Sequence, residues 1–160
     1  MFLKKCFFAS MLLAATLCSD EEIEINCATV TCLSVDNSIS IKFIDQETDD
    51  NLISNGVYSP SQITITDLQD TATNFEIQKD FEDEDVLVLD LENQSFGEIG
   101  YEVRITDGVV FNFTLNTSYG EGSECCGPYI NIDDVSVHNV VNEFSQYGTL
   151  PLSLTIFISD

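Results

Sequence analysis

The chain contains no tryptophan and one histidine, and only five of its 160 residues are lysine or arginine. Proteins that bind the nucleic-acid backbone need clustered basic residues, so this scarcity excludes that class of partner. His138 is accompanied by no G-x-S-x-G motif, which argues against Ser-His-Asp hydrolysis. The lack of tryptophan also removes the largest aromatic platform for a sugar ring. The sequence therefore predicts a protein that is not an enzyme and holds no resident cofactor.

Long apolar runs are absent as well. The longest, residues 6–17, has about 12 residues, whereas a membrane-spanning helix needs roughly 20. It follows two lysines, Lys4 and Lys5, and this order is typical of a signal peptide. We therefore predict a signal peptide over residues 1–17, an acidic tether over residues 18–26 and one folded domain over residues 27–160.

The apolar run ends at Cys18, which is followed by a serine and three acidic residues: Ser19, Asp20, Glu21 and Glu22. This segment resembles a bacterial lipoprotein signal, and Cys-Ser-Asp-Glu-Glu is similar to the export tag of surface-exposed lipoproteins of the Bacteroidota. The resemblance implies a diacylglyceryl thioether on Cys18, acyl chains such as palmitate, and display on the outer face of the outer membrane. The chain departs from the usual pattern at Leu17, where a small residue is typical. The alternative is a secreted protein in which Cys18 is incidental.

Negative charge dominates the composition. The 28 acidic side chains give a net charge of −23, and only Lys42, Lys79 and Arg104 oppose them after residue 17. Such a chain does not adhere electrostatically to anionic lipid, so membrane attachment depends on the acyl chains. The charge serves solubility or, alternatively, binds divalent cations. Disorder is excluded for most of the chain because 44% of the residues are hydrophobic and 11 are phenylalanine.

Four cysteines remain once Cys6 and Cys18 are set aside: Cys27, Cys32, Cys125 and Cys126. An even number in an exported chain predicts disulfides, with three possible connectivities. Adjacent cysteines bond to each other only in a strained ring, which favours bonds from Cys125 and Cys126 to the two early cysteines. The rival interpretation is a zinc site made by all four thiolates.

Short segments of alternating polarity, separated by turn residues, fill the rest of the chain. They cover residues 28–33, 39–44, 62–66, 75–79, 86–91, 101–106, 109–115, 129–132 with 135–137, and 152–158. Asp107-Gly108 predicts a hairpin turn, and a short helical turn is possible over residues 140–144. The pattern predicts an all-β fold: one two-sheet antiparallel β-sandwich of 8–9 strands, immunoglobulin-like or transthyretin-like.

The stretch from Ser38 to Ile65 also resembles a transthyretin-like, or carboxypeptidase-regulatory-like, β-sandwich. In such domains a strand ends in an Asp-x-x-Thr turn before a second β-run, and Asp45-Gln46-Glu47-Thr48 occupies that place. The resemblance implies the sandwich and no activity.

Two acidic loops offer hard oxygen ligands of the kind that calcium prefers, although neither matches the twelve-residue calcium loop. Their candidate ligands are Asp45, Glu47, Asp49, Asp50, Asp80, Glu82, Asp83 and Asp85. A solvated loop without a metal is the alternative for both.

The glycine-rich segment before the paired cysteines is a candidate recognition surface, in which Tyr119 and Tyr129 offer contact area. A connector whose tyrosines pack on the sandwich edge is the alternative. We therefore expect a cell-surface lipoprotein, held at the outer membrane by its lipid, that acts as a binding or accessory module for extracellular protein or glycan. The alternative function is a calcium-dependent, carbohydrate-active or hydrolytic surface protein that uses clustered carboxylates.

Overall fold

The computed structural model describes residues 27–29, 36–91, 96–106, 108–122, 125–126, 128–145 and 148–159. The chain divides into two compact units, Met1–Thr31 and Cys32–Asp160. In the first unit, the described residues form the 3-10 helix η1 (Cys27–Thr29). The prediction of a strand over residues 28–33 is wrong at its start, because residues 28 and 29 lie in this 3-10 helix. The predictions for the signal peptide, for Cys18 to Glu22 and for Cys32 lie outside the described residues.

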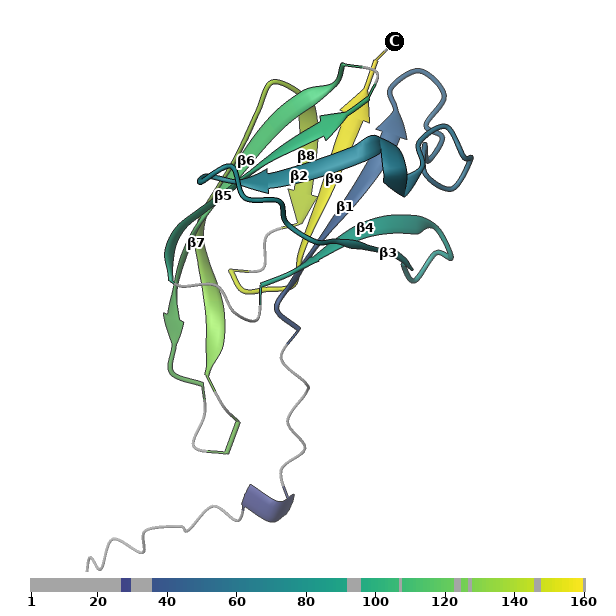
Figure 1. The fold of residues 1–160 in the computed structure, drawn as a ribbon. Helices are drawn as coiled ribbons and strands as arrows, with labels where there is room; N and C mark the ends of the chain where they lie inside the picture. The colour runs from purple at the N-terminus through teal and green to yellow at the C-terminus, as the bar shows by residue number, and fades with distance from the viewer. Residues whose placement is uncertain are drawn as a thin grey trace, which may run out of the picture. The chain divides into compact units, whose positions relative to one another are not determined.

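The second unit is a β-sandwich of two sheets (Figure 1). The five-stranded sheet has the order β3-β4-β1-β9-β8, and the four-stranded sheet has the order β2-β5-β6-β7. The strands are β1 (Ser38–Asp45), β2 (Ile63–Asp67), β3 (Glu76–Lys79), β4 (Asp85–Asp90), β5 (Gly97–Ile105), β6 (Val110–Gly120), β7 (Tyr129–His138), β8 (Val141–Ser145) and β9 (Leu152–Ile158). A 3-10 turn, η2 (Pro60–Gln62), precedes β2. The predicted all-β fold with two packed sheets is confirmed.

The core lies between the two sheets and is built from every second residue of the central strands. Ile39, Ile41 and Phe43 of β1 are fully buried, as are Phe111 and Phe113 of β6. The rings of Phe43 and Phe111 meet edge to face, with centroids 6.1 Å apart. Because successive side chains of a strand point to opposite faces, the residues between these core positions lie on the outer faces of the sheets.

The prediction of antiparallel sheets holds for all the described strand pairs except one. Strands β1 and β9 pair in parallel, from Ile39 opposite Leu152 to Asp45 opposite Ile158. These strands stand at opposite ends of the domain sequence, so no tight turn joins them and no turn constrains their direction. Alternation with period two is the same for either direction, and the sequence pattern therefore leaves this pairing undetermined.

One local prediction differs from the structure, and one alternative that the sequence leaves open, one bent strand or two over residues 129–137, is decided by it. The segment expected to hold a helical turn, residues 140–144, is covered largely by β8, which pairs with β9 from Val141 opposite Phe157. The segments 129–132 and 135–137 form one strand, β7, with a shift of register between Asn116 and Thr117 of its partner. In both cases pairing with a neighbouring strand decides the conformation.

The hairpin predicted at Asp107-Gly108 is present between β5 and β6, but its loop is longer than two residues. The amide of Ile105 donates to the carbonyl of Val109, and Gly108 donates back to Ile105. Ile105 and Val109 therefore close the loop, and Gly108 has a φ of 95°. This is the three-residue hairpin loop, which needs a left-handed residue at its third position.

Candidate functional site

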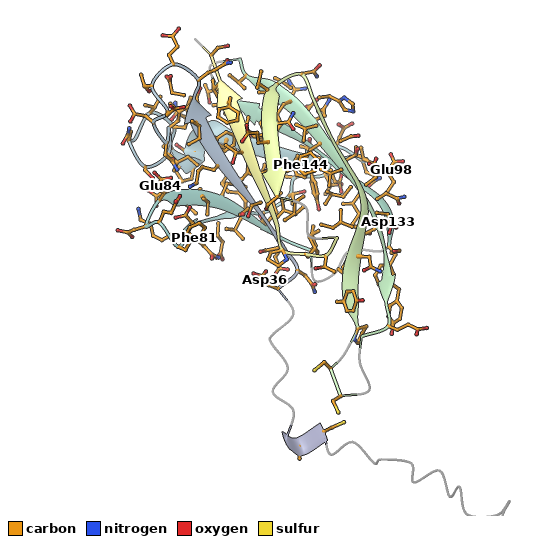
Figure 2. All side chains as sticks on the ribbon, turned by 180° about the vertical axis from the view of Figure 1, so that it is seen from behind. Asp36, Phe81, Glu84, Glu98, Asp133 and Phe144 are labelled. Carbon is orange, nitrogen blue, oxygen red and sulfur yellow. The ribbon has the colours of Figure 1, made fainter. Side chains whose placement is uncertain are left out.

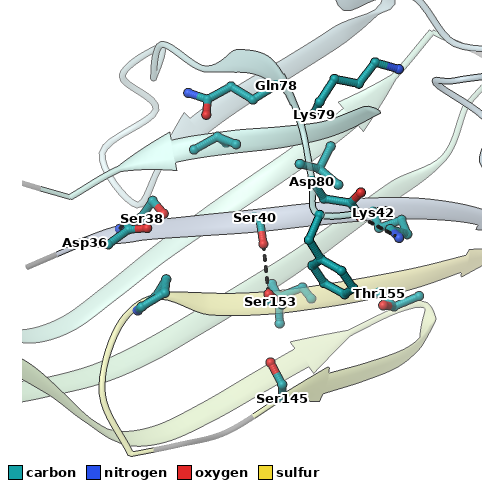
Figure 3. Close-up of a pocket in the computed structure, with 15 residues that line it drawn as sticks. Asp36, Ser38, Ser40, Lys42, Gln78, Lys79, Asp80, Ser145, Ser153 and Thr155 are labelled. Carbon is teal, nitrogen blue, oxygen red and sulfur yellow. Dashed lines mark hydrogen bonds and ion pairs between the residues drawn. The ribbon is translucent and has the colours of Figure 1, made fainter. Parts of the chain in front are cut away.

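A groove of about 580 Å³ lies on the outer face of the five-stranded sheet (Figure 3). Small hydroxyl side chains from adjacent strands form its centre. Ser40 of β1 stands opposite Ser153 of β9, which stands opposite Ser145 of β8. The Ser40 hydroxyl donates to the Ser153 hydroxyl over 3.0 Å. Three short side chains in one row across the sheet leave this face hollow.

The next row along the same strands is longer and carries charge. Lys42 stands opposite Thr155 of β9, and Gln78 and Val86 continue the row across β3 and β4. Val86 is buried in the floor of the groove, so the floor is apolar there, next to hydroxyl and amide groups. Such a mixture of apolar surface and a few polar groups is typical of ligand pockets.

Phe81 borders the groove at the tip of the β3–β4 hairpin and is 95% exposed (Figure 2). The hairpin loop is tightly ordered around Asp80. The Asp80 carboxylate accepts the amides of Glu82, at 2.8 Å, and Glu84, at 3.0 Å. Asp83 takes the left-handed position with a φ of 63°. The loop is therefore held by hydrogen bonds, while the aromatic ring beside it makes little contact with the protein.

Lys42 is the centre of an ion cluster at this end of the groove. Its ammonium lies 2.8 Å from Asp80, 3.1 Å from Glu82 and 2.7 Å from Glu84. Burial alone would lower the pKa of Lys42, but the hydrogen bonds to Asp80, Glu84 and Glu82 raise it above its usual value. Lys42 is therefore a fixed cation and has no tendency to act as a base.

The cluster also changes the charge state of Asp80. Partial burial favours the neutral carboxyl group, but bonds from the Lys42 ammonium and from the amides of Glu84 and Glu82 outweigh it and lower the pKa of Asp80. Asp80 is consequently a carboxylate at any pH near neutrality.

The same cluster bears on the calcium prediction for residues 80–85. Oxygens of Asp80, Glu82 and Glu84 lie within 4.8 Å of one another, a spacing that suits a metal ion. The predicted ligand set does not include Glu84, although this residue lies in the same acidic run. The Lys42 ammonium contacts all three carboxylates, so a cation of the protein already bridges them and offsets one of their three negative charges. Asp83 lies in the turn, and Asp85 pairs with Lys79 at 3.0 Å.

The other predicted calcium loop, at residues 45–50, uses its first carboxylate to build the turn. The Asp45 carboxylate accepts the amides of Glu47 and Thr48 at 2.8 and 2.9 Å, and these bonds lower the pKa of Asp45, the bond from Thr48 most. Asp49 adopts the left-handed conformation with a φ of 60°. Backbone amides therefore take up an oxygen that a metal would need, and Asp49 stands where a turn commonly has glycine or asparagine.

The fold brings these two acidic loops together through residues that the sequence did not single out. Asn51, which is 4% exposed, donates its side-chain amide to the carbonyl of Asp85 over 3.0 Å. The Asp85 amide in turn donates to the Ser54 hydroxyl over 2.7 Å. Asn51 also accepts the amides of Ile53 and Ser54. In the sequence, the sign of this contact between the two loops is an asparagine, Asn51, at the end of an acidic stretch.

The two candidate recognition tyrosines lie near each other at the far end of the β6–β7 hairpin. Tyr119 is 55% exposed and meets Phe96 edge to face, with centroids 5.7 Å apart. Tyr129 stands opposite Gly120, and a side chain on Gly120 would overlap the Tyr129 ring. Tyr129 therefore packs on its neighbouring strand, whereas Tyr119 keeps half of its surface exposed.

The cysteine prediction is confirmed as far as it concerns disulfides. Cys27, Cys125 and Cys126 are all disulfide-bonded. Sulfur atoms in disulfides carry no thiolate charge and do not ligate zinc, so the rival interpretation of a four-cysteine zinc site is wrong.

Comparison of the chain with protein-family models, with curated proteins and with solved structures gave no match. The described residues include no helix that is long and apolar enough to cross a membrane. The groove and the side chains around it are therefore the features that bear on function.

Proposed function

We propose that this chain is a non-catalytic surface lipoprotein whose β-sandwich binds an extracellular protein or glycan. Its Cys18 carries the lipid, and the export tag Ser19 to Glu22 directs it to the outside of the outer membrane. The observation that carries the binding role is the groove of about 580 Å³ on the outer face of the five-stranded sheet. Its volume falls within the about 300–1,000 Å³ that ligand pockets commonly have.

A binding role is supported over catalysis by the chemistry of the groove. Serine hydroxyls become nucleophiles only beside a general base. Lys42 lines the groove, but three carboxylates hold it as an ammonium, so it does not accept a proton from a serine. His138 lies on β7 opposite Asn112, in the other sheet. Within the described part of the groove, no base stands ready to activate Ser40 or Ser153.

The alternative of a calcium-dependent, carbohydrate-active or hydrolytic surface protein has less support. This function requires carboxylates that are free to bind a metal. The clustered carboxylates of Asp80, Glu82 and Glu84 contact Lys42 instead. The carboxylate of Asp45 is likewise engaged by backbone amides.

The binding role is tested by filling the groove. The full chain and its Ser40→Trp variant are applied to an array that carries extracellular proteins and glycans. We expect the indole, placed in the centre of the hydroxyl row, to abolish binding. Ser136→Trp is the matched control, because Ser136 lies on β7 of the other sheet, opposite Thr114. Equal binding by the wild type and Ser40→Trp contradicts the proposal.

The lipid anchor needs a separate measurement. Intact mass spectrometry of the protein purified from its native membrane should show an N-terminus at Cys18 with acyl chains added. The Cys18→Ala variant should lose this mass addition and its membrane fraction. An unmodified N-terminus at another residue contradicts the anchor and leaves the binding role standing.

A further inference from the structure

The groove presents hydroxyl groups in rows instead of isolated polar contacts. Ser40, Ser153 and Ser145 form one row across three strands, and Thr155 follows in the next. Each hydroxyl both donates and accepts hydrogen bonds and rotates to suit its partner. A ligand that itself carries many hydroxyl groups matches this surface best, because each serine hydroxyl can either donate a hydrogen bond to a ligand hydroxyl or accept one from it.

Both lysines of the groove are already paired with carboxylates of the protein. Lys42 contacts three carboxylates, and Lys79 pairs with Asp85 at 3.0 Å. Asp36, at the opposite end of the lining, accepts the amide of Ser38 at 3.0 Å. Two lysines stand against the five carboxylates of Asp36, Asp80, Glu82, Glu84 and Asp85, so the formal charge around the groove is −3 and disfavours an anionic ligand. The hydroxyl row at the centre offers partners for uncharged hydroxyl groups, and the lysines already engage the carboxylates beside them.

Phe81 adds an apolar face at the border of the groove. Its ring is 95% exposed, although the loop that carries it is fixed by Asp80 and Lys42. A phenylalanine so exposed on a well-ordered loop loses contact with water only when a partner covers it. The ring is available to pack against the apolar C–H face of a sugar, which is the role that a tryptophan would otherwise serve.

From these three features we infer that the groove binds an uncharged oligosaccharide segment, with sugar hydroxyls on the Ser40–Ser153–Ser145 row and a sugar face on Phe81. This inference depends on the proposed binding function and names its ligand class. Lys42 acts as a positioning residue, because it clamps the loop that presents the aromatic ring.

The test measures binding of the full chain to immobilised polymers by biolayer interferometry. Four are uncharged polysaccharides: a β-glucan, a mannan, a xylan and a dextran. Two are charged polysaccharides, polygalacturonate and chitosan, and two are extracellular proteins, collagen and fibronectin. The variants are Phe81→Ala and Ser40→Trp. Their matched controls are Phe96→Ala and Ser136→Trp, which change the same residue types on the other sheet or beside it. Thermal unfolding confirms that each variant is folded.

We expect at least one uncharged polysaccharide to bind, with an affinity lowered at least about tenfold by Phe81→Ala, which corresponds to the loss of one good contact. Ser40→Trp should abolish this binding, and both controls should leave it within about twofold. Binding only to charged polymers or proteins, if Ser40→Trp abolishes it, overturns the glycan inference and leaves the binding function intact. Binding that Ser40→Trp leaves unchanged, or no binding to any of the eight polymers, overturns both.

Discussion

The ammonium of Lys42 lies 2.7 Å from the carboxylate of Glu84, across the space between β1 and the β3–β4 hairpin loop. This contact connects the centre of the five-stranded sheet to the loop that carries Phe81. It places one of the few cations of an acidic chain where three carboxylates converge. The relationship explains both why the acidic loop is ordered and why it is a poor metal site.

Removal of this cation should destabilise the domain. In Lys42→Met, three carboxylates lose their shared partner and repel one another, and we expect the free energy of unfolding to fall by about 2 kcal/mol. Chemical denaturation measures the change. Lys79→Met is the control, because Lys79 is 52% exposed and its single ion pair should contribute less than about 1 kcal/mol. Equal effects of the two substitutions would show that the cluster has no special role.

The same variant should acquire an affinity for calcium. With Lys42 replaced by methionine, oxygens of Asp80, Glu82 and Glu84 still lie close together but lack a cation. We expect millimolar calcium to raise the melting temperature of Lys42→Met by several degrees more than that of the wild type, measured by differential scanning fluorimetry. A triple variant that also carries Asp80→Asn and Glu84→Gln should lose this shift. A calcium response of equal size in the wild type would restore the calcium-dependent alternative.

Acidification should reveal the contribution of Asp80. Because the folded state lowers the pKa of Asp80, the folded protein keeps this group ionised where the unfolded chain binds a proton. The resulting stability is present above the unfolded pKa, about 3.9, and is lost as the pH falls through the lower folded value. Between pH 6 and pH 2, the free energy of unfolding should therefore fall less steeply with decreasing pH for Asp80→Asn than for the wild type. Asp134→Asn, on the exposed surface of β7, should follow the wild type.

Tyr101 should govern stability at high pH. Burial, together with the charge of Asp67, raises the pKa of Tyr101 to about 12. Between the unfolded pKa of about 10 and this value, the folded state holds a proton that the unfolded chain has released, so stability falls as the pH rises. Tyr101→Phe should remove this part of the slope in unfolding measurements from pH 9 to pH 12. Tyr119→Phe, at an exposed position, should retain it.

The Tyr101 variant carries a second expectation at neutral pH. Among the described residues, the buried Tyr101 hydroxyl has no hydrogen-bond partner. Its removal should leave the free energy of unfolding unchanged or raise it by up to about 1 kcal/mol. A loss of more than about 1 kcal/mol would show that the hydroxyl is hydrogen-bonded in solution.

Reduction of the disulfides should lower stability substantially. A bond from an early cysteine to Cys125 or Cys126, as the sequence predicts, closes a loop of about 100 residues, for which the chain-entropy model gives a stabilisation of roughly 4 kcal/mol. Denaturation with and without a phosphine reductant measures the difference. Thiol counting on the denatured, unreduced protein is the control and should find no free thiol at Cys27, Cys125 or Cys126. Unchanged stability after complete reduction would contradict this expectation.

Much of the fold follows from local patterns in the chain. The alternation at residues 39–44 predicts β1, and the runs at 86–91 and 152–158 predict β4 and β9 to within one residue at most boundaries. Each has enough β-branched and aliphatic residues at period two to specify a strand with one buried face. Where the pattern is weaker, as at Val141–Ser145, pairing with β9 decides the conformation, and the sequence prediction of a helical turn is wrong.

The candidate site was less predictable. The acidic loops stand out in the sequence because of their composition, yet the roles of their members differ. Asp45 and Asp80 cap turns, Asp49 and Asp83 occupy left-handed positions, and Glu84 meets Lys42. Ser40 and Ser153 of the groove are 113 residues apart in the chain, and no spacing rule connects them.

The sequence by itself determined the class of fold, because period-two alternation and turn residues act over short distances. It also indicated the cysteine chemistry in outline, because an even set of cysteines behind a predicted signal peptide favours disulfides. The tertiary structure alone decided that β1 and β9 pair in parallel, that Ser40 meets Ser153, and that Lys42 occupies the acidic cluster. These contacts join residues remote in the chain, and they form only when the packing of two sheets brings the strands into one register.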